Sequence, residues 1–508
     1  MPTREGPCRP RPFRLASAPR HSLNQKLVLI EGTAHNPFME IAKTQVVVLG
    51  GGPGGYAAAF YAADKGLQVT LVEQEKRLGG ACLNHGCIPS KALLHAVEPI
   101  LEARESTKRG IFFEPPRIQL DPLRAWKDGI LAKLGQGIGQ LADRRKVQVV
   151  QGRGSFVAAN RLKIESETGA QEVAFEHAII ATGSAPAMPA VFNIGSTRVM
   201  TSTQALELPE IPTRLLVIGG GYIGMELGTV YAALGSQVVV VEALDTILAG
   251  ADPDLVRPVA NQAKKQFKDV RLRSRVLQLS EEPGCIRALI ETNGVQQAEE
   301  FDRVLVAVGR SANPQNLGLE AAGIQISEKG FIQVDACQRT SAPSILAIGD
   351  VVGGVMLAHK AAKEGRIAVD SILGNATDAS NYVLPAVVFT DPEIAWCGVT
   401  ETEARALGMD IKVTRFPWSA SGRALTLDRV DGTTKLVVDS RTERILGVGI
   451  VGHGAGELIG EGVLAVQSGA TASELAHAVH PHPTLSETLM EAAEAFFGTA
   501  THAITRRG

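Results

Sequence analysis

Two stretches of the chain share one pattern of apolar and glycine-rich positions. In the first, the β-branched run Val46–Val48 leads into a glycine cluster, an alanine-rich segment and a second apolar run, Val69–Val72. The second stretch repeats this order from about residue 214 and ends in the run Val238–Val241. Short β-branched runs are typical of buried strands, and the longer segments between them are typical of helices. The pattern predicts two strand–turn–helix–strand units of an α/β fold.

Both turns match the pattern G-x-G-x-x-G, in which glycines let the backbone approach a pyrophosphate at the start of the following helix. The matching glycines are Gly50, Gly52 and Gly55 in the first unit and Gly219, Gly221 and Gly224 in the second. Each unit closes with an acid at the same distance from its first glycine, Glu73 or Glu242. A carboxylate there can accept hydrogen bonds from ribose hydroxyls. Two such units predict two dinucleotides, as in a flavin enzyme that exchanges electrons with a nicotinamide.

The second unit also indicates which nicotinamide is bound. A carboxylate at Glu242 accepts from the 2′-hydroxyl of NAD and repels the 2′-phosphate of NADP, and no arginine follows within residues 242–254. The two units differ seven residues after the first glycine, where the first has Ala57 and the second Glu226. Glu226 is either an exposed residue that stabilises the helix N-terminus or a functional carboxylate. A functional carboxylate needs a cation, and Lys91 is the candidate.

The composition is that of a multidomain globular enzyme. The 508 residues are too many for one core, and they are 45% hydrophobic and 20% charged with a formal net charge of −2. That balance predicts no nucleic acid partner, and no apolar run is long enough to predict a membrane span. Residues 1–40 are rich in arginine and proline. The arginines suit a mitochondrial transit peptide, but the prolines oppose its helix, so a disordered or non-native extension and a cytoplasmic location are favoured.

The segment GGACLNHGCIPSKALL, residues 79–94, places Cys82 and Cys87 close together. A metal site needs about four ligands, and only His85 lies nearby, so no metal is expected. In a regular helix the two cysteines would point about 140° apart, so a disulfide between them requires an irregular turn, for which Gly86 and Pro89 are suited. The other cysteines stand singly and are expected to be buried apolar residues: Cys8, Cys285, Cys337 and Cys397.

The same segment closely resembles the redox-active segment of the dihydrolipoamide dehydrogenases, a family of flavin-dependent pyridine nucleotide–disulfide oxidoreductases. The similarity extends from about Thr44 to about Thr499, and residues 178–186, 304–320, 345–365 and 387–404 also agree with the family pattern. The resemblance implies two Rossmann-like dinucleotide-binding domains, for FAD and NAD, and a C-terminal α+β dimerisation domain. The implied limits are residues 41–188 for the FAD domain, 189–314 for the NAD domain, 315–382 for a central domain that completes the FAD site, and 383–508 for the interface domain.

The resemblance also implies roles for single residues. Cys82 and Cys87 form a redox disulfide, in which Cys82 is the more accessible cysteine and Cys87 the one nearer the flavin. Lys91, paired with Glu226, lies near the reactive flavin nitrogen. The further residues implied for FAD are Gly50, Gly52, Gly55, Glu73, Thr182, Gly183, Asp350 and Ala358. Those implied for NAD are Gly219, Gly221, Gly224, Glu242 and Gly309.

The C-terminal segment HPHPTLSETLMEAAEAF contains His480, His482 and Glu487. A lone histidine is more often a packing residue than a base, but the segment resembles the histidine–glutamate pair of the family. The resemblance makes His482 the base, oriented by Glu487, and implies a homodimer because this segment serves the partner subunit's site. The family has alanine where this chain has Pro481. An imidazole paired with a carboxylate can take a thiol proton near neutral pH, and only the thiolate attacks a disulfide.

These features predict NAD-linked oxidation of dihydrolipoamide carried on lipoyl domains of 2-oxo acid dehydrogenase complexes or on the glycine cleavage carrier protein. The alternatives are a glutathione reductase-like or a mercuric reductase-like enzyme. The former has basic residues where Glu242 stands, and the latter has a further cysteine pair near the C-terminus, whereas no cysteine follows Cys397. A third possibility is a binding role within a large complex. A mitochondrial matrix location is the alternative to the cytoplasm if residues 1–40 are a transit peptide.

Overall fold

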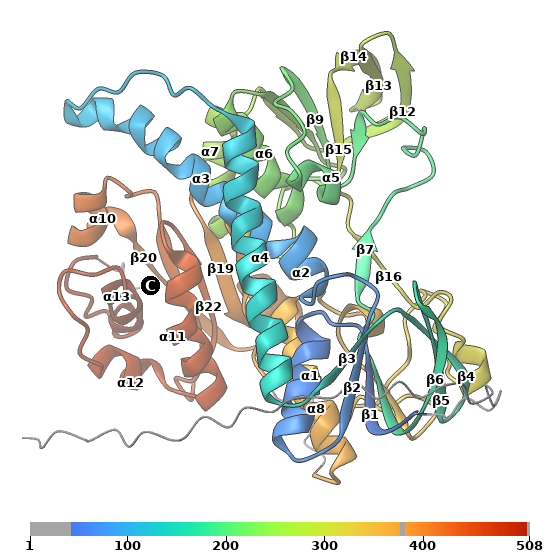
Figure 1. Ribbon diagram of the computed structural model, residues 1–508. Helices are drawn as coiled ribbons and strands as arrows, with labels where there is room; N and C mark the ends of the chain where they lie inside the picture. The colour runs from blue at the N-terminus through green and yellow to red at the C-terminus, as the bar shows by residue number, and fades with distance from the viewer. Residues whose placement is uncertain (1–41, 376–381, 505–508) are drawn as a thin grey trace, which may run out of the picture. The chain divides into compact units, whose positions relative to one another are not determined.

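The computed structural model describes residues 42–375 and 382–504, so the predicted N-terminal extension lies outside the described residues. Within them the chain forms a mixed α/β sheet, a second α/β sheet that is parallel, a C-terminal antiparallel sheet with helices, and two small antiparallel sheets (Figure 1). The predicted fold class is confirmed. No helix among the described residues is long and apolar enough to cross a membrane.

The first sheet has seven strands in the order β3-β2-β1-β6-β5-β4, with β17 paired to β6. Its strands are β1 (Ala42–Leu49), β2 (Val69–Glu73), β3 (Gln148–Gln151), β4 (Arg153–Ala158), β5 (Arg161–Ser166), β6 (Gly169–Ile180) and β17 (Ile345–Ala347). Helices α1 (Pro53–Asp64) and α8 (Ala358–Ile372) lie side by side and share one apolar cluster with β1, β2, β6 and β17 (Figure 1). A strand from residue 345 therefore completes a sheet that begins at residue 42.

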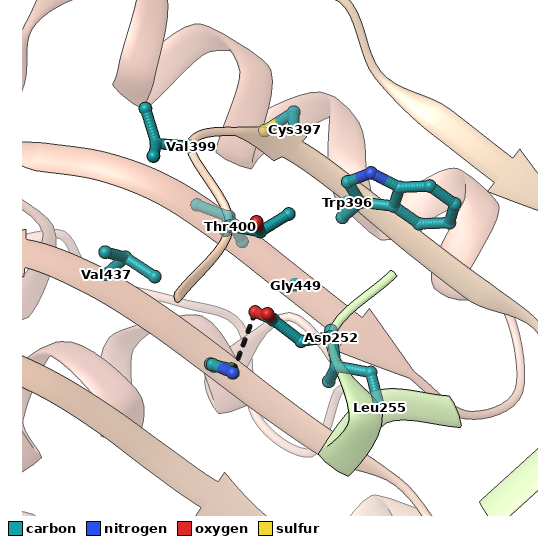
Figure 2. Close-up of a pocket in the computed structure, with 10 residues that line it drawn as sticks. Asp252, Leu255, Trp396, Cys397, Val399, Thr400, Val437 and Gly449 are labelled. Atoms are coloured by element: carbon teal, nitrogen blue, oxygen red, sulfur yellow. Dashed lines mark hydrogen bonds and ion pairs between the residues drawn. The ribbon is translucent and has the colours of Figure 1, made fainter. Parts of the chain in front are cut away.

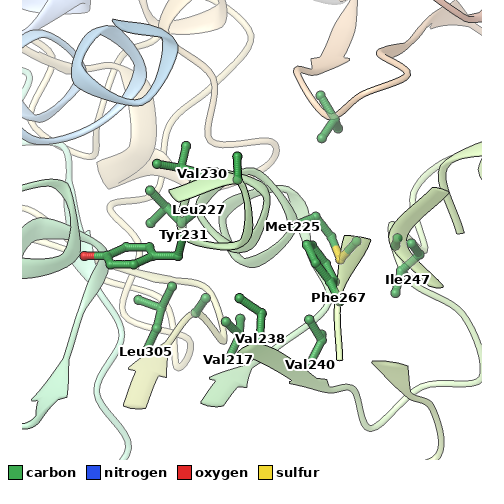
Figure 3. Close-up of a cluster of buried hydrophobic side chains, with 14 of the residues drawn as sticks. Val217, Met225, Leu227, Val230, Tyr231, Val238, Val240, Ile247, Phe267 and Leu305 are labelled. Atoms are coloured by element: carbon green, nitrogen blue, oxygen red, sulfur yellow. The ribbon is translucent and has the colours of Figure 1, made fainter. Parts of the chain in front are cut away.

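The second sheet has five parallel strands in the order β11-β10-β9-β15-β8. They are β8 (Val199–Met200), β9 (Arg214–Ile218), β10 (Gln237–Val241), β11 (Asp269–Arg271) and β15 (Arg303–Val306). Helix α6 (Tyr222–Leu234) packs Leu227 and Tyr231 over the strand residues Val217, Val238 and Leu305 (Figure 3). These bounds match the second strand–turn–helix–strand unit predicted from the apolar pattern.

Two smaller sheets accompany the second sheet. An antiparallel sheet consists of β12 (Ser274–Glu282), β13 (Cys285–Thr292) and β14 (Val295–Phe301). A two-stranded sheet pairs β7 (Ser184–Pro186) with β16 (Arg310–Ala312). The short helices outside the C-terminal region are α5 (Ser202–Leu206), η1 (Thr107–Arg109), η2 (Leu319–Ala322) and η3 (Gly349–Val352).

The C-terminal sheet is antiparallel in the order β18-β19-β22-β21-β20. Its strands are β18 (Ala386–Val388), β19 (Ile394–Gly398), β20 (Ile411–Pro417), β21 (Thr433–Asp439) and β22 (Ile445–Val451). The accompanying helices are α9 (Glu401–Ala406), η4 (Trp418–Ala420), α10 (Gly422–Leu427), α11 (Ala455–Ser468), α12 (Ala472–His477) and α13 (Glu487–Phe497). Trp418 is fully buried in this core, and its indole N–H donates to the hydroxyl of Thr434 at 3.0 Å.

Helix α3 connects the first unit to the second. The cysteine segment forms α2 (Gly80–His85) and α3 (Cys87–Ser106), which are followed by α4 (Leu120–Arg144). Leu93 and Val97 of α3 belong to the apolar cluster of Met225 and Leu227 on α6. This packing places the helix that carries Cys87 against the helix that carries Glu226.

A buried ion cluster joins the second unit to the C-terminal sheet. Lys435 of β21 is 2% exposed, and its Nζ lies 2.9 Å from carboxylate oxygens of both Asp252 and Asp254 and 2.7 Å from Glu401. Asp252 and Asp254 lie at the start of α7 (Pro253–Gln266). The three carboxylates of Asp252, Asp254 and Glu401 thus surround the ammonium group of Lys435. Beside them is a small cavity of about 10 Å³, lined by Asp252, Leu255, Trp396 and Thr400 among others (Figure 2).

The scattered cysteines only partly match their prediction. Cys285 and Cys397 are buried, as expected for small apolar residues. The prediction was wrong for Cys337, which is half-buried. Its backbone N–H donates to Asp335, in a turn near the surface rather than in a core strand. Cys8 lies outside the described residues.

Candidate active site

The two glycine turns have the same backbone geometry. The first glycines, Gly50 and Gly219, have φ angles of +108° and +109°, a backbone conformation that residues with a side chain rarely adopt. A Cβ at Gly55 would lie 1.7 Å from the carbonyl oxygen of Gly50, and one at Gly224 would lie 2.1 Å from that of Gly219. The third glycine of each motif therefore lets the helix pack directly on the turn.

The helices that follow the turns begin without side-chain caps. Gly52 is the N-cap of α1 and Gly221 that of α6, and neither helix start has a side-chain hydrogen bond. A Cβ at Gly221 would meet nothing within 4 Å, so the space above this helix end is open. The first N–H groups of a helix form an anion site when no side chain occupies them. Both starts fit the pyrophosphate of a dinucleotide.

The closing acids are oriented in the same way in both units. Glu73 accepts hydrogen bonds from the N–H of Gly51 at 2.6 Å and of Glu75 at 2.9 Å. Glu242 accepts from the N–H of Gly220 at 2.6 Å and of Leu244 at 2.8 Å. Burial raises the pKa of Glu73. Each carboxylate oxygen has a second lone pair, so both acids can still accept from a ribose hydroxyl.

The remaining residues expected for FAD cluster around β7 and β16. Asp350 accepts a hydrogen bond from the hydroxyl of Ser184 and lies 3.8 Å from the guanidinium of Arg310. Its segment, η3, directly follows β17. Thr182 and Gly183, also expected for FAD, form hydrogen bonds with Asn313, and Ala358 begins α8. Gly309, which is expected for NAD, accepts a hydrogen bond from the Ala187 N–H. Asp350 is the residue predicted for the ribityl and pyrophosphate side of FAD.

An irregular turn separates the two cysteines, as predicted. Helix α2 ends at His85 and α3 begins at Cys87, and Gly86 between them has φ −147° and ψ −111°. Both cysteines are free thiols in this structure. The Cys82 thiol lies beside the Cys87 sulfur, close enough to change its acidity. The turn therefore brings the two sulfurs together, which a regular helix would not.

The expected order of accessibility is reversed in the chain. Cys87 is exposed and Cys82 half-buried, although the resemblance implied that Cys82 is the more accessible cysteine. The implied order refers to a protein with flavin beside Cys87, whereas these exposures are those of the protein chain by itself. The sequence alone does not determine which of the two cysteines is buried by other parts of the chain.

The two thiols differ in acidity. Hydrogen bonding with the Cys82 thiol lowers the pKa of Cys87 to about 7, and the nearby Lys91 ammonium acts in the same direction. Both effects outweigh the desolvation of the sulfur by the surrounding protein, although part of the residue is exposed. The same hydrogen bond, together with burial, raises the pKa of Cys82 well above its usual range. Cys87 is therefore the sulfur that carries the negative charge when both cysteines are reduced.

Lys91 and Glu226 form a close ion pair. Lys91 Nζ lies 2.8 Å and 3.0 Å from the two carboxylate oxygens of Glu226. The Glu226 side chain is 4% exposed, which excludes the alternative of an exposed helix-end glutamate. It also accepts from the Ser90 hydroxyl at 2.8 Å and from the Phe389 N–H at 3.0 Å. Sequence reasoning missed Ser90 and Phe389, although both lie inside segments that were singled out for their family pattern.

His482 and Glu487 form the second pair that the structure brings together. His482 Nδ1 lies 2.8 Å from Glu487 Oε1, and Glu487 Oε2 accepts from the Thr484 N–H at 2.6 Å. Partial burial acts to raise the pKa of Glu487, but these two hydrogen bonds outweigh it and lower the pKa. The His482 side chain is 73% exposed. Among the described residues, the hydrogen bond and ion pair of His482 join it to Glu487 and to neither Cys82 nor Cys87.

His480 has a structural partner. Its Nε2 lies 2.8 Å from Glu461 Oε1, and its Nδ1 lies 2.8 Å from the Ala478 carbonyl oxygen. The side chain is 6% exposed. Both ring nitrogens are thus engaged, so of the two histidines His482 is the one with a free nitrogen.

Comparison with known proteins identifies this arrangement. Residues 44–365 match the family described as pyridine nucleotide-disulphide oxidoreductase, and residues 384–493 match the dimerisation domain of that family. The chain belongs to the pyridine nucleotide-disulphide oxidoreductase family. Its members are oxidoreductases with FAD and a pyridine nucleotide, so the predicted enzyme class and the cofactors FAD and NAD are confirmed.

The relatives within this family agree with the resemblance found in the sequence. The chain is 45% identical to dihydrolipoyl dehydrogenases from Vibrio cholerae and Haemophilus influenzae, over 90% of this chain and 97% and 96% of theirs. Among solved structures it is similar to LpdA from Mycobacterium tuberculosis, with a TM-score of 0.83 and 29% identity over 89% of this chain and 99% of that chain. The resemblance to the dihydrolipoamide dehydrogenases is confirmed.

Proposed function

We propose that the chain catalyses NAD-linked oxidation of protein-bound dihydrolipoamide to lipoamide, with Cys82 and Cys87 as the redox pair. The observation that carries this proposal is the turn at Gly86. It brings the two sulfurs close together and places Cys87 one helical turn before Lys91. The dihydrolipoyl dehydrogenases to which the chain is 45% identical support the substrate. Glu242 supports NAD rather than NADP.

The reaction starts from the Cys82–Cys87 disulfide. One substrate thiolate attacks the sulfur of Cys82, forming a mixed disulfide, and Cys87 leaves as a thiolate. The second substrate thiolate attacks the substrate sulfur of that mixed disulfide, so Cys82 leaves and takes a proton. The product carries the new S–S bond, and the other proton goes to the imidazole of His482.

Each protein group has one task in this scheme. The Cys82 hydrogen bond and the Lys91 ammonium stabilise the Cys87 thiolate, which lowers its pKa to about 7. Glu487 holds His482 through Nδ1 and leaves Nε2 free for the thiol proton. When bound, FAD would supply the two-electron acceptor for the dithiol, and NAD would supply the final hydride acceptor. The N-termini of α1 and α6, with Glu73 and Glu242, would hold the two cofactors.

The same proposal includes a homodimer and partner proteins. The match to the dimerisation domain supports a dimer, and the exposed His482 supports a base that serves the partner subunit's cysteines. The substrate would be carried on lipoyl domains of 2-oxo acid dehydrogenase complexes or on the glycine cleavage carrier protein. The bacterial dihydrolipoyl dehydrogenases among the relatives support a cytoplasmic location. A transit peptide for the mitochondrial matrix would depend on residues 1–40, outside the described chain.

The domain limits are proposed as the sequence analysis gave them. They are residues 41–188 for FAD, 189–314 for NAD, 315–382 for the central domain and 383–508 for the interface. The strand order supports a central segment that returns to the first sheet, because β17 pairs with β6.

The test is the formation of NADH from dihydrolipoamide and NAD by the purified protein. We expect turnover with this pair, and little or none when NADP replaces NAD. In the reverse direction, NADPH with glutathione disulfide should give no reaction. Efficient glutathione disulfide reduction by NADPH would instead favour the glutathione reductase-like alternative, and no turnover with either pair would favour a binding role.

A further inference from the structure

The Lys91–Glu226 pair has a third member from a distant part of the chain. The centre of the Phe389 ring lies 4.6 Å from Lys91 Nζ, and the Phe389 N–H donates to Glu226 Oε1 at 3.0 Å. Phe389 follows β18 in the C-terminal sheet, whereas Lys91 belongs to α3 and Glu226 to α6. One residue therefore contacts both partners of the ion pair, through its ring and through its backbone.

The Phe389 ring is fixed in place on its other side. Phe389 is half-buried, and a Cβ at Gly456 in the first turn of α11 would lie 3.3 Å from the edge of its ring. The N–H of Gly456 in turn donates to Glu393 Oε2 at 2.8 Å. The ring thus occupies space that the absence of a side chain at Gly456 leaves beside α11, with Lys91 at its face.

Lys91 needs such a contact to hold one position. Its side chain is 31% exposed and has a flexible four-carbon stem, so the ion pair with Glu226 alone leaves part of it facing solvent. An aromatic face attracts an ammonium group through its quadrupole and carries no net charge. A second carboxylate in the same place would also attract Lys91, but it would oppose a thiolate nearby. The ring fixes the cation without that effect.

The cation acts on Cys87. Cys87 and Lys91 are four residues apart on α3, so they lie on the same face of the helix. The titratable groups around the Cys87 sulfur are Cys82 from α2, Lys91 from α3, and Glu226 and Tyr222 from α6. Of these, Lys91 is the cation, and its distance from Cys87 decides how strongly the thiolate is stabilised.

We propose that Phe389 is a positioning residue that holds the Lys91 ammonium beside Cys87 and so keeps Cys87 as a thiolate at neutral pH. This inference rests on the proposed role of Cys87 as the charged member of the reduced pair. It assigns to the C-terminal sheet a contribution to the redox centre of its own chain, separate from the His482 base.

The test measures the long-wavelength charge-transfer absorbance between the Cys87 thiolate and the flavin in the reduced holoprotein as a function of pH, and its midpoint reports the titration of Cys87. Phe389→Leu should move the midpoint upward by roughly half a pH unit, because the ring contact is lost. Phe389→Tyr should keep the midpoint, since its ring also attracts a cation. Phe113→Leu, at an aromatic residue 63% exposed and remote from the pair, is the matched control and should change nothing.

A double-variant comparison separates positioning from a general effect on folding. Lys91→Met should raise the midpoint further than Phe389→Leu, and adding Phe389→Leu to Lys91→Met should give no additional shift. If Phe389→Leu folds poorly, Phe389→Met takes its place, because it keeps an apolar side chain of similar size without the ring. It should raise the midpoint by the same amount. The proposal is overturned if Phe389→Leu and Phe389→Met leave the midpoint unchanged, or if the shift persists in the Lys91→Met background.

The absorbance titration does not require lipoamide turnover. Failure of the NADH assay with a normal Phe389 effect would therefore reject the proposed substrate and leave the positioning role intact. Normal turnover with no effect of the Phe389 variants would reject the positioning role and leave the proposed substrate intact.

Discussion

The Cys82 thiol lies beside the Cys87 sulfur, and the interaction between them makes two chemically identical groups differ in acidity. The pKa of Cys87 is lowered to about 7, so its alkylation rate should rise through neutral pH while Cys82 stays protonated. Cys82→Ala removes the donor and should raise the pKa of Cys87 toward the ordinary thiol value, about 8.5. Alkylation rates of each cysteine between pH 5 and about pH 10 measure this, with Cys337→Ala as the control. Equal midpoints for both cysteines in the unchanged protein would contradict the assignment.

Replacing either cysteine of the pair should stop the reaction without releasing the flavin. Cys82→Ser and Cys87→Ser should each lower dihydrolipoamide turnover by at least about a thousandfold, because neither hydroxyl can form the disulfide that accepts the electrons. FAD should stay bound, since the glycine turns and Glu73 are unchanged. Turnover and the flavin absorbance of the purified variants are the two measurements. Near-normal turnover in either variant would be incompatible with the exchange scheme.

The acid that closes the second unit should determine cofactor choice. Glu242, held by two backbone N–H groups, would face the 2′-phosphate of NADP, which costs roughly 3 kcal/mol or about a hundredfold in kcat/KM. Glu242→Ala should narrow the gap between NAD and NADP. Glu73→Ala, the equivalent change in the first unit, should lower flavin content and leave that ratio unchanged. Comparable kcat/KM for NAD and NADP in the unchanged protein would rule out this role.

The exposed base predicts complementation between inactive subunits. His482 bonds to Glu487 and to neither cysteine of its own chain, so each site of the proposed dimer needs both subunits. Cys87→Ser and His482→Gln homodimers should lack lipoamide activity, whereas a heterodimer has one site with both residues intact. It should show about half of the unchanged activity if the two sites act independently. A purified heterodimer without activity would mean that each chain supplies its own base.

The ion cluster around Lys435 should govern stability in acid. Burial of Asp252 acts to raise its pKa, but hydrogen bonds from Thr402 and Lys435 outweigh it and lower the pKa to about 2; the pKa of Glu401 is also lowered to about 2, likewise against the effect of burial. Carboxylates with a lowered folded-state pKa stabilise the fold above about pH 4 and lose that effect as the pH falls toward 2. Thermal unfolding followed between these limits should show a steep decrease in melting temperature.

Removing the central cation tests the same cluster at neutral pH. Lys435→Met leaves Asp252 buried without its ammonium partner and should destabilise the protein by about 3–5 kcal/mol. The double variant with Asp252→Asn should recover part of the loss. Lys108→Met removes a surface ion pair and should leave the melting temperature nearly unchanged. A melting temperature of Lys435→Met equal to that of Lys108→Met would show that the cluster is not stabilising.

Some of the site was predictable because its parts lie close together in sequence. The turn at Gly50, the helix after it and the acid Glu73 all fall within one short segment, so spacing alone determines their contacts. The break at Gly86 was predictable for the same reason. The partners of Glu226 were not, apart from Lys91. Phe389 lies 163 positions from Glu226 in the sequence. It binds Glu226 through its backbone N–H, which almost every residue type has, so the residue type does not indicate this contact.

Burial was the other property that the sequence did not determine. Asp252, Asp254 and Glu401 are ordinary surface residue types, and only the packing of α7 on β22 and β19, and of α9 on β20, places them around Lys435. The exposures of Cys82, Cys87 and Cys337 depend in the same way on neighbours that are distant in sequence.

Strand β17 has a consequence for synthesis on the ribosome. The five strands of the second sheet all lie between residues 199 and 306, whereas the first sheet receives β17 only at residues 345–347. A chain that emerges from its N-terminus can therefore complete the second sheet while the C-terminal end of β6, residues 178–180, still has an unpaired edge. An unpaired strand edge is a site for incorrect pairing. Asp350 follows β17 directly, so the edge is covered and the flavin-side acid becomes available at the same moment. FAD binding is thus expected late in co-translational folding, after β17 has paired with β6. Bound FAD would then indicate that the first sheet is complete.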